Sequence, residues 1–241
     1  MRLLKFTLSG KTAFFKKPDV NTYVYFTYGQ IHKVALLGIF GAILGYGGYS
    51  QMAEGDVFPE FYEKLKDLQL SIIPRNKHGF IPKKIQAFNN SVGYASFEQG
   101  GNLIVKEQWL ESPEWDIYVK LDHEESRKLS DAVLNKQSVF IPYLGKNDHV
   151  ADIKSAYLIE DAADAGQVTA IDSLAPYEWL MLDWDEDEIE GTPFKYEEYL
   201  PISLDEESNL YQLQRFLFTN LPIEDQKCQV IRAEQKNLVF Y

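Results

Sequence analysis

The apolar segment from Val34 to Leu44 is the feature that most constrains how this chain can fold. Its apolar residues nearly encircle a helical axis, so the sequence predicts a helix that is buried on most sides. Gly38, Gly41 and Gly45 lie three and four positions apart, which places them on one face, where a neighbouring backbone can approach closely. That packing must offset about 1 kcal/mol of helix propensity for each glycine. The run is shorter than the ~20 apolar residues of a membrane span, so we interpret it as a core helix.

Length and cysteine content limit the class of protein. The chain has 241 residues, of which 45% are apolar, enough for one large domain or for one domain with a smaller appendage. Cys228 is the one cysteine, which excludes an intrachain disulfide and a zinc site built on cysteines. The first eight residues are interrupted by charge and lack the apolar core of a signal peptide. We therefore expect a soluble, cytoplasmic protein.

The charge is divided unevenly along the chain. The net charge is −12, but residues 1–100 contain 12 basic and 7 acidic residues, whereas residues 101–241 contain 12 and 29. Because binding surfaces are local, a basic N-terminal face is compatible with an acidic whole. The acidic half then serves to keep the protein soluble.

The hydrophobic pattern predicts a ferredoxin-like domain of the α+β class. We expect strands at 2–9, 68–73, 115–121 and 138–143, and helices at 34–44, 56–67 and 123–136. Short alternating segments and two turn sequences, Asn89-Asn90 and Gly100-Gly101-Asn102, predict a β-hairpin inserted at about 74–114. The resulting order of elements is the βαββαβ order of ferredoxin-like and RRM-like domains.

The remainder of the chain predicts a small β-rich region. We expect short strands at 153–159, 168–171, 178–182, 199–203 and 229–232, and one further helix at 209–217. A boundary near residue 150 would separate a ferredoxin-like domain, residues 1–150, from a C-terminal appendage, residues 151–241. The acidic run 183–190 lacks the glycine and the glutamate that a calcium loop requires, so we interpret it as a solvated loop.

The sequence contains no motif for catalysis, metal binding or nucleotide binding. Its four histidines are dispersed, with no pair at metal-ligand spacing. Neither a phosphate-binding loop nor a Gly-x-Ser-x-Gly turn is present. We therefore expect no metal, no cofactor and no small-molecule substrate.

Basic residues are interleaved with aromatic residues in the N-terminal half, a mixture typical of proteins that bind single-stranded RNA. Lysine and arginine can hold phosphates while aromatic rings stack on unpaired bases. His32 and Lys33 also lie at the N-terminus of a predicted helix, a position that favours phosphate binding. The ordinary alternative, core aromatics with solvated lysines, stays open. The candidate RNA-binding residues are Lys16, Lys17, Tyr23, Tyr28, His32, Lys33, Arg75, Lys77, Lys83, Lys84 and Lys146.

Several of these segments resemble the CRISPR-associated Cas-five family of the RAMP superfamily. The matching motifs are Lys16-Lys17-Pro18-Asp19, the aromatic stretch 23–28, the glycine-rich helix from Ala35 to Gly45, and the turn Pro142-Tyr143-Leu144-Gly145. They cover about a fifth of the chain, and the predicted order of elements extends the likeness to roughly residue 150. The likeness is closest to the type I-B branch of the family.

The resemblance implies a non-catalytic, RNA-binding subunit of the Cascade surveillance complex. Such a subunit holds the 5′ handle of a CRISPR RNA and caps one end of the backbone filament. The insertion at 74–114 would be the thumb hairpin that packs against the guide. The implied partners are the CRISPR RNA, the backbone and large subunits, and target DNA held by the assembled complex, with no membrane.

Two alternatives stay open. The type I-C branch cleaves precursor RNA with a tyrosine, a lysine and a histidine, and here Tyr46 and Lys106 match the first two. Glu107 stands where that branch has histidine, and a glutamate is a poor base near neutral pH, although His78 could substitute from elsewhere. The second alternative is a protein-only scaffold whose acidic face docks onto basic neighbours.

Overall fold

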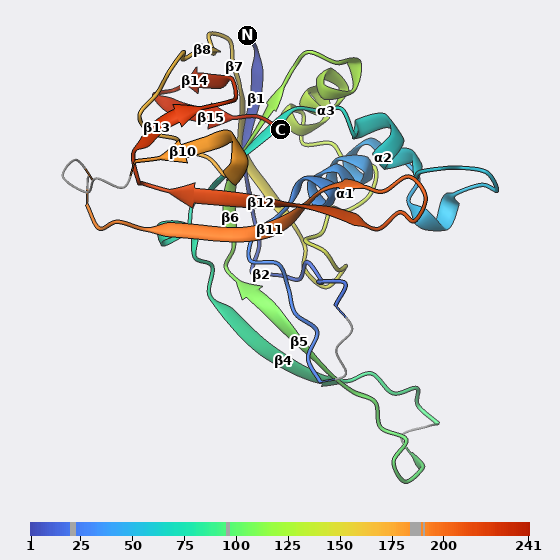
Figure 1. The fold of residues 1–241 in the computed structure, drawn as a ribbon. Helices are drawn as coiled ribbons and strands as arrows, with labels where there is room; N and C mark the ends of the chain where they lie inside the picture. The colour runs from blue at the N-terminus through green and yellow to red at the C-terminus, as the bar shows by residue number, and fades with distance from the viewer. Residues whose placement is uncertain (20–22, 95–96, 184–188, 190) are drawn as a thin grey trace.

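A four-stranded antiparallel sheet forms the centre of the protein. The structure is a computed structural model, and it describes residues 1–19, 23–94, 97–183, 189 and 191–241 (Figure 1). The sheet has the order β3-β6-β1-β7, with bounds β1 (Leu3–Ser9), β3 (Leu70–Pro74), β6 (Glu114–Lys120) and β7 (Asp152–Ile159). Helices α1 (Lys33–Leu44) and α3 (Glu124–Leu134) lie in the two crossovers. The chain therefore has the βαββαβ order, which confirms the predicted fold class.

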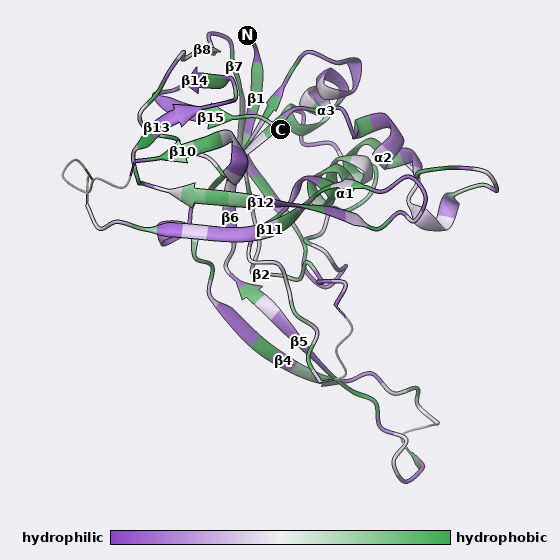
Figure 2. Ribbon diagram, in the orientation of Figure 1, coloured by the Kyte–Doolittle hydropathy of each residue, from purple (hydrophilic) through white to green (hydrophobic). Residues whose placement is uncertain are grey.

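Helix α1 is the buried helix that the sequence predicts. The His32 side chain caps it by accepting a hydrogen bond from the Ala35 N–H at 3.2 Å, and Gly45 ends it at φ 81°. Its glycine stripe faces α2 (Glu60–Leu65), because a Cβ atom added to Gly41 would lie 2.5 Å from Cβ of Phe61. Figure 2 shows α1 as largely hydrophobic, in contrast with α3 at the surface. Among the described residues, no helix is long and apolar enough to cross a bilayer.

The predicted insertion is a β-hairpin that projects from the body of the protein (Figure 1). It belongs to a second sheet with the order β2-β5-β4, whose strands are β2 (Thr12–Ala13), β4 (Lys83–Asn89) and β5 (Ile104–Glu111). The register of β4 and β5 runs without a break from Lys83↔Leu110 to Asn89↔Ile104. A short 3₁₀ helix, η2 (Lys77–Gly79), precedes the hairpin.

The C-terminal region consists of short sheets, in agreement with the predicted β-rich character. One sheet has the order β11-β12-β9, formed by β11 (Lys195–Leu204), β12 (Tyr211–Thr219) and β9 (Ala175–Pro176). Another has the order β15-β14-β8, formed by β15 (Lys236–Val239), β14 (Val230–Ala233) and β8 (Ala163–Asp164). The third pairs β10 (Leu180–Leu182) with β13 (Ile223–Gln226). Two further 3₁₀ helices are η1 (Tyr49–Gln51) and η4 (Tyr177–Trp179).

Three predicted elements were wrong. Residues 138–143 are not a strand: the N–H groups of Val139 and Phe140 bond to the carbonyls of Ile43 and Ala42 at the end of α1, so this segment caps a helix instead of joining a sheet. The fourth strand of the domain is β7. Residues 209–217 are not a helix, because from Tyr211 onward they form β12 and pair with β11, and residues 168–171 form no strand.

The two predicted regions share one hydrophobic core. Strand β7 begins just beyond residue 150 yet pairs with β1 in the central sheet. The core beneath that sheet joins Phe6 and Phe40 to Leu174, Phe216 and Tyr241 from the C-terminal region. Most of the acidic run 183–190 lies outside the described residues. The C-terminal strands are therefore placed close to the N-terminal elements that carry the candidate RNA-binding residues.

Candidate nucleic-acid interface

A cleft of about 1090 Å³ opens between α1, the base of the projecting hairpin and strand β12. We call it the aromatic cleft, because most of its larger lining side chains are aromatic: Phe14, Phe15, Tyr25, Tyr46, Tyr49, Phe61, Phe140, Tyr143 and Tyr211. Tyr49 and Tyr143 are 52% and 45% exposed, so their rings are accessible to a ligand. Accessible aromatic rings in a groove are the platforms on which unpaired bases stack.

The loop between β2 and α1 reaches the cleft because it folds back on itself. The N–H of Lys17 bonds to the carbonyl of Phe26, and the N–H of Tyr28 to that of Phe15, both at 2.8 Å. Tyr25 then joins β5 through its own N–H and carbonyl, which bond to Lys106 and Gln108 at 2.9 Å. The loop is thereby fixed against the base of the hairpin.

Lys16 and Lys17 are adjacent in the sequence but differ in their surroundings. The Lys16 side chain is exposed, lines the aromatic cleft and lies over the Tyr25 ring, with 4.0 Å between Nζ and the ring centroid. Lys17 Nζ instead pairs with Oε1 of Glu198 at 2.9 Å. The other oxygen of Glu198 accepts hydrogen bonds from the Gly29 N–H at 2.8 Å and the Tyr196 hydroxyl at 2.6 Å. Lys17 therefore helps to anchor the loop to β11.

Lys146 lies in the cleft, but its charge is already matched. Its Nζ donates to both oxygens of Glu107, at 3.1 and 3.2 Å, and Nε1 of Trp109 donates to the same carboxylate at 2.8 Å. The Glu107 side chain is only 6% exposed, and the two charges form a neutral pair beneath the cleft. Among the described lysines that line the cleft, Lys16 alone has no acidic partner.

Three other candidate residues at the start of α1 are buried. His32 is 3% exposed, its Nδ1 accepts the capping hydrogen bond, and burial lowers its pKa to about 3, so the ring is neutral at physiological pH. Burial likewise lowers the pKa of Lys33 to about 8 and raises the pKa of the Tyr28 hydroxyl. His32 reaches the wall of the cleft, where its ring contacts Tyr28 and Tyr211 edge-on. His32 therefore forms part of the cleft wall, whereas Tyr28 and Lys33 lie outside the lining.

The remaining candidates lie outside the cleft lining. Tyr23 is 83% exposed on the loop, and Lys77 and Lys83 are exposed in η2 and at the start of β4. Lys84 pairs with Glu111 at 3.3 Å. The structure thus places Lys16, His32 and Lys146 in the lining of one cleft, with Tyr28 in contact with His32, and leaves the other candidates outside the lining.

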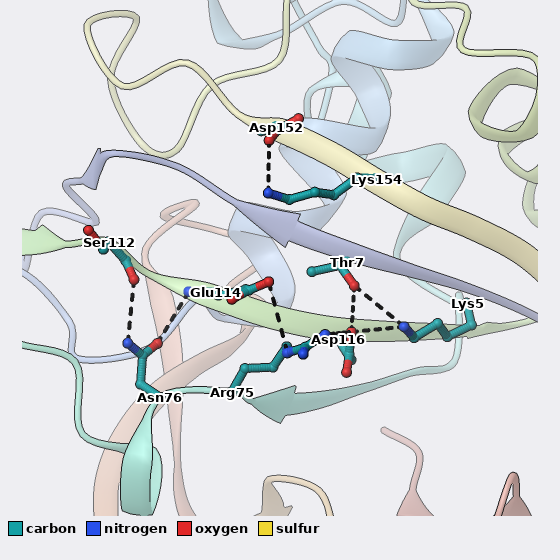
Figure 3. Close-up of polar contacts among 9 residues, drawn as sticks. All are labelled: Lys5, Thr7, Arg75, Asn76, Ser112, Glu114, Asp116, Asp152 and Lys154. Carbon is teal, nitrogen blue, oxygen red and sulfur yellow. Dashed lines mark hydrogen bonds and ion pairs between the residues drawn. The ribbon is translucent and has the colours of Figure 1, made fainter.

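Arg75 belongs to a polar network on the face of the central sheet (Figure 3). Its guanidinium lies 3.5 Å from Oδ1 of Asp116, and the same oxygen pairs with Lys5 Nζ at 3.0 Å and accepts from the Thr7 hydroxyl at 2.7 Å. Glu114 lies 3.9 Å from Arg75. Acidic groups thus surround this arginine, which makes this face a weaker phosphate site than the aromatic cleft.

The three residues considered for RNA cleavage are dispersed. The Tyr46 hydroxyl donates to Glu125, and burial together with this carboxylate raises its pKa to about 12. His78 stacks on Phe194 with 4.8 Å between ring centroids, and Lys106 is exposed on β5. Among the described residues, no contact joins any two of the three, and no group of His, Cys, Asp and Glu could hold a metal ion.

Sequence reasoning missed the residues that complete the cleft. Tyr211 was assigned to a helix, but it lies at the start of β12 and contacts His32. Phe140 lies in the predicted strand 138–143, but the segment caps α1 instead and leaves Phe140 exposed at the cleft. The alternation of apolar and polar residues after Tyr211 was the available signal for a strand.

Comparison with known proteins identifies the fold. No protein-family model and no curated protein sequence matches this chain. A chain of a CRISPR RNA-guided surveillance complex superposes with a TM-score of 0.52 at 13% identity, over 92% of this chain and 91% of the other. A CRISPR protein from Archaeoglobus fulgidus gives 0.51 at 11% identity, over 99% of both chains. The protein therefore has the fold of these CRISPR proteins, and the resemblance inferred from sequence is confirmed at the level of the fold.

Proposed function

We propose that this protein is an RNA-binding subunit of a CRISPR RNA-guided complex, and that the aromatic cleft holds an unpaired segment of the guide RNA. The observation that carries the proposal is the meeting of exposed aromatic rings with the unpaired charge of Lys16 in one cleft, at the base of a projecting hairpin. That this fold also occurs in a chain of an RNA-guided surveillance complex supports it.

The chemistry of the cleft favours bases over backbone. Each stacked base contributes ~1–3 kcal/mol on aromatic platforms of this kind. Because Glu107 matches the charge of Lys146, the described lysines of the lining supply one free positive charge, at Lys16, for a phosphate. Unpaired RNA, with its bases available for stacking, fits this balance better than a duplex does.

Within this proposal we assign the chain a place in a cytoplasmic type I Cascade, of the I-B branch. It would hold the 5′ handle of the CRISPR RNA, cap the backbone filament, and contact the backbone and large subunits, with target DNA bound by the whole assembly. The sequence motifs of the N-terminal half support this assignment. The acidic C-terminal half supports contacts with basic neighbouring subunits.

We propose further that the chain binds RNA without cutting it. Metal-free cleavage needs a base near neutral pKa beside the 2′-hydroxyl, whereas the Tyr46 hydroxyl is engaged by Glu125 and its pKa is raised. Incubating the purified chain with repeat RNA in EDTA tests this point. A discrete cut that disappears in Tyr46→Phe would contradict it.

The RNA-binding proposal is tested by ultraviolet crosslinking and by affinity measurements with a single-stranded repeat RNA. We expect Tyr143→Ala to remove a stacking platform and weaken binding by about tenfold. Lys16→Glu should lower the slope of log K against log salt by ~0.7, the value for one phosphate contact on single strands. Lys236→Glu makes the same charge change at a site paired with Asp172 in the C-terminal region, and should leave both quantities unchanged. Equal effects of Lys16→Glu and Lys236→Glu would refute the assignment of the cleft.

A further inference from the structure

Strand β4 is the outer strand of the projecting hairpin, and none of the described strands pairs with its outer edge. In the sheet order β2-β5-β4, the central strand β5 pairs on both sides. The second edge of β5 is used by β2 and by Tyr25, whereas among the described residues β4 pairs with β5 alone. Figure 1 shows β4 along the outside of the hairpin, away from the body of the protein.

Hydrogen bonds at the two ends of the hairpin ladder fix which backbone groups of β4 face outward. The N–H of Glu111 donates to the carbonyl of Pro82, and the N–H of Asn90 donates to the carbonyl of Leu103, both at 2.8 Å. Alternate residues of an antiparallel strand bond to the same partner, and the register between these two ends is unbroken. The even-numbered residues therefore bond to β5. The residues whose N–H and C=O groups point outward are Lys83, Ile85, Ala87 and Asn89.

This edge is unlike the other long edges of the protein. A bulge at Ser155, with φ 52° and a shift of register against β1, interrupts β7. Pro201 and a second register shift interrupt β11, and β3 is covered by backbone bonds from Leu174 and Tyr241. Bulges, prolines and covering segments are the means by which proteins prevent strands from pairing with other chains. In the part of the chain that the structure describes, β4 has none of them between Ile85 and Asn89.

We propose that the outer edge of β4 is a docking site for an extended segment of a partner protein, which adds a strand to the hairpin. An extended polypeptide offers a donor and an acceptor at every second residue, as this edge requires. RNA phosphates can only accept hydrogen bonds and would leave the outward carbonyls unpaired. The proposal concerns a protein partner and does not depend on RNA binding in the cleft.

The side chains of β4 define the chemistry of that segment. Lys83 and Lys84 lie at one end of the strand, which contains no acidic residue. Lys84 pairs with Glu111 of β5 at 3.3 Å, so Lys83 carries the charge that a partner segment can match. Ile85 is 53% exposed beside the free edge. Opposite charges and apolar pairs across neighbouring strands stabilise a sheet. The partner segment should therefore carry an acidic residue opposite Lys83 and an apolar residue opposite Ile85.

A synthetic nine-residue peptide with glutamate opposite Lys83, valine opposite Ile85 and threonine elsewhere tests the edge directly on the full chain. We expect it to slow amide exchange at Ile85 and Ala87, measured by NMR, by at least about tenfold. The same peptide N-methylated at the amides that face β4 should have no effect. Unchanged exchange at both amides with the unmodified peptide would overturn the proposal, and so would protection of these amides by single-stranded RNA or by self-association of the chain.

A variant of β4 separates docking from folding. Ile85→Pro removes an outward N–H that makes no bond to β5, so the hairpin is retained while peptide affinity should fall about tenfold. Ile85→Thr keeps the N–H and should bind within about threefold of the original chain. In complexes co-expressed with partner subunits, Ile85→Pro should lose a protein subunit and retain RNA. Retention of every subunit would refute the proposal, whereas loss of RNA from Tyr143→Ala complexes reports on the cleft alone.

Discussion

The glycine stripe of α1 predicts that alanine substitutions at Gly38 and Gly41 change the free energy of unfolding by different amounts. A Cβ added at Gly41 would lie 2.5 Å from Cβ and 3.3 Å from Cγ of Phe61, so α2 would have to move. A Cβ added at Gly38 meets its nearest atom, Cε2 of Phe61, at 4.0 Å, which is an ordinary contact. Both substitutions gain the same ~1 kcal/mol of helix propensity, so the difference between them isolates the packing at Phe61.

The magnitudes follow from these distances. Overpacking of a filled core costs about 1–3 kcal/mol, so Gly41→Ala should range from neutral to ~2 kcal/mol less stable. Gly38→Ala should be about 1 kcal/mol more stable than the original chain. Urea unfolding followed by circular dichroism gives both values, provided that the slope of the transition is unchanged. If the two variants differ by less than about 0.5 kcal/mol, the close approach of α2 to Gly41 is not what requires glycine there.

Two further predictions concern charges beside the cleft. Because burial lowers the pKa of His32 from 6.5 to about 3, the unfolded chain binds the extra proton between these values, and stability should fall by about 2 kcal/mol from pH 7 to pH 5. His32→Asn keeps a capping side chain and should lose that part of the pH dependence; an identical pH profile would contradict a neutral, buried His32. Lys146→Ala leaves the Glu107 carboxylate buried without its partner and should cost ~2–4 kcal/mol in thermal unfolding. The double variant Lys146→Ala with Glu107→Gln should recover most of the lost stability. If the losses of the two single variants simply add, the Lys146–Glu107 ion pair does not account for them.

The first half of the fold was predictable because its signals are local. The apolar run of α1, its glycine ending and the turns of the hairpin each specify an element within about fifteen residues. The fourth strand was misplaced because residues 138–143 have the composition of a buried strand, while their backbone is used to cap α1. When the carbonyls at a helix C-terminus accept hydrogen bonds from a segment far along the chain, the local sequence pattern does not reveal it.

The candidate site was only partly predictable for a related reason. The lysines and tyrosines in the loop before α1 indicate a binding surface. The sequence does not show which of these lysines form ion pairs with acidic residues far along the chain. Lys17 is matched by Glu198 and Lys146 by Glu107, which leaves Lys16 as the free charge among the described lysines of the cleft. Tyr211 reaches the cleft only because β12 pairs with β11 and crosses near α1.

The contacts of the Glu198 carboxylate determine when, during translation, the loop between β2 and α1 can fold. This one side chain, from β11, holds Lys17, Gly29 and Tyr196 together, and β11 is itself paired along its length with β12. The loop that faces the cleft therefore cannot take its final shape until residues as late as Thr219 have been synthesised and have left the exit tunnel. A nascent chain would therefore complete the aromatic cleft late, when nearly the whole polypeptide is available for assembly.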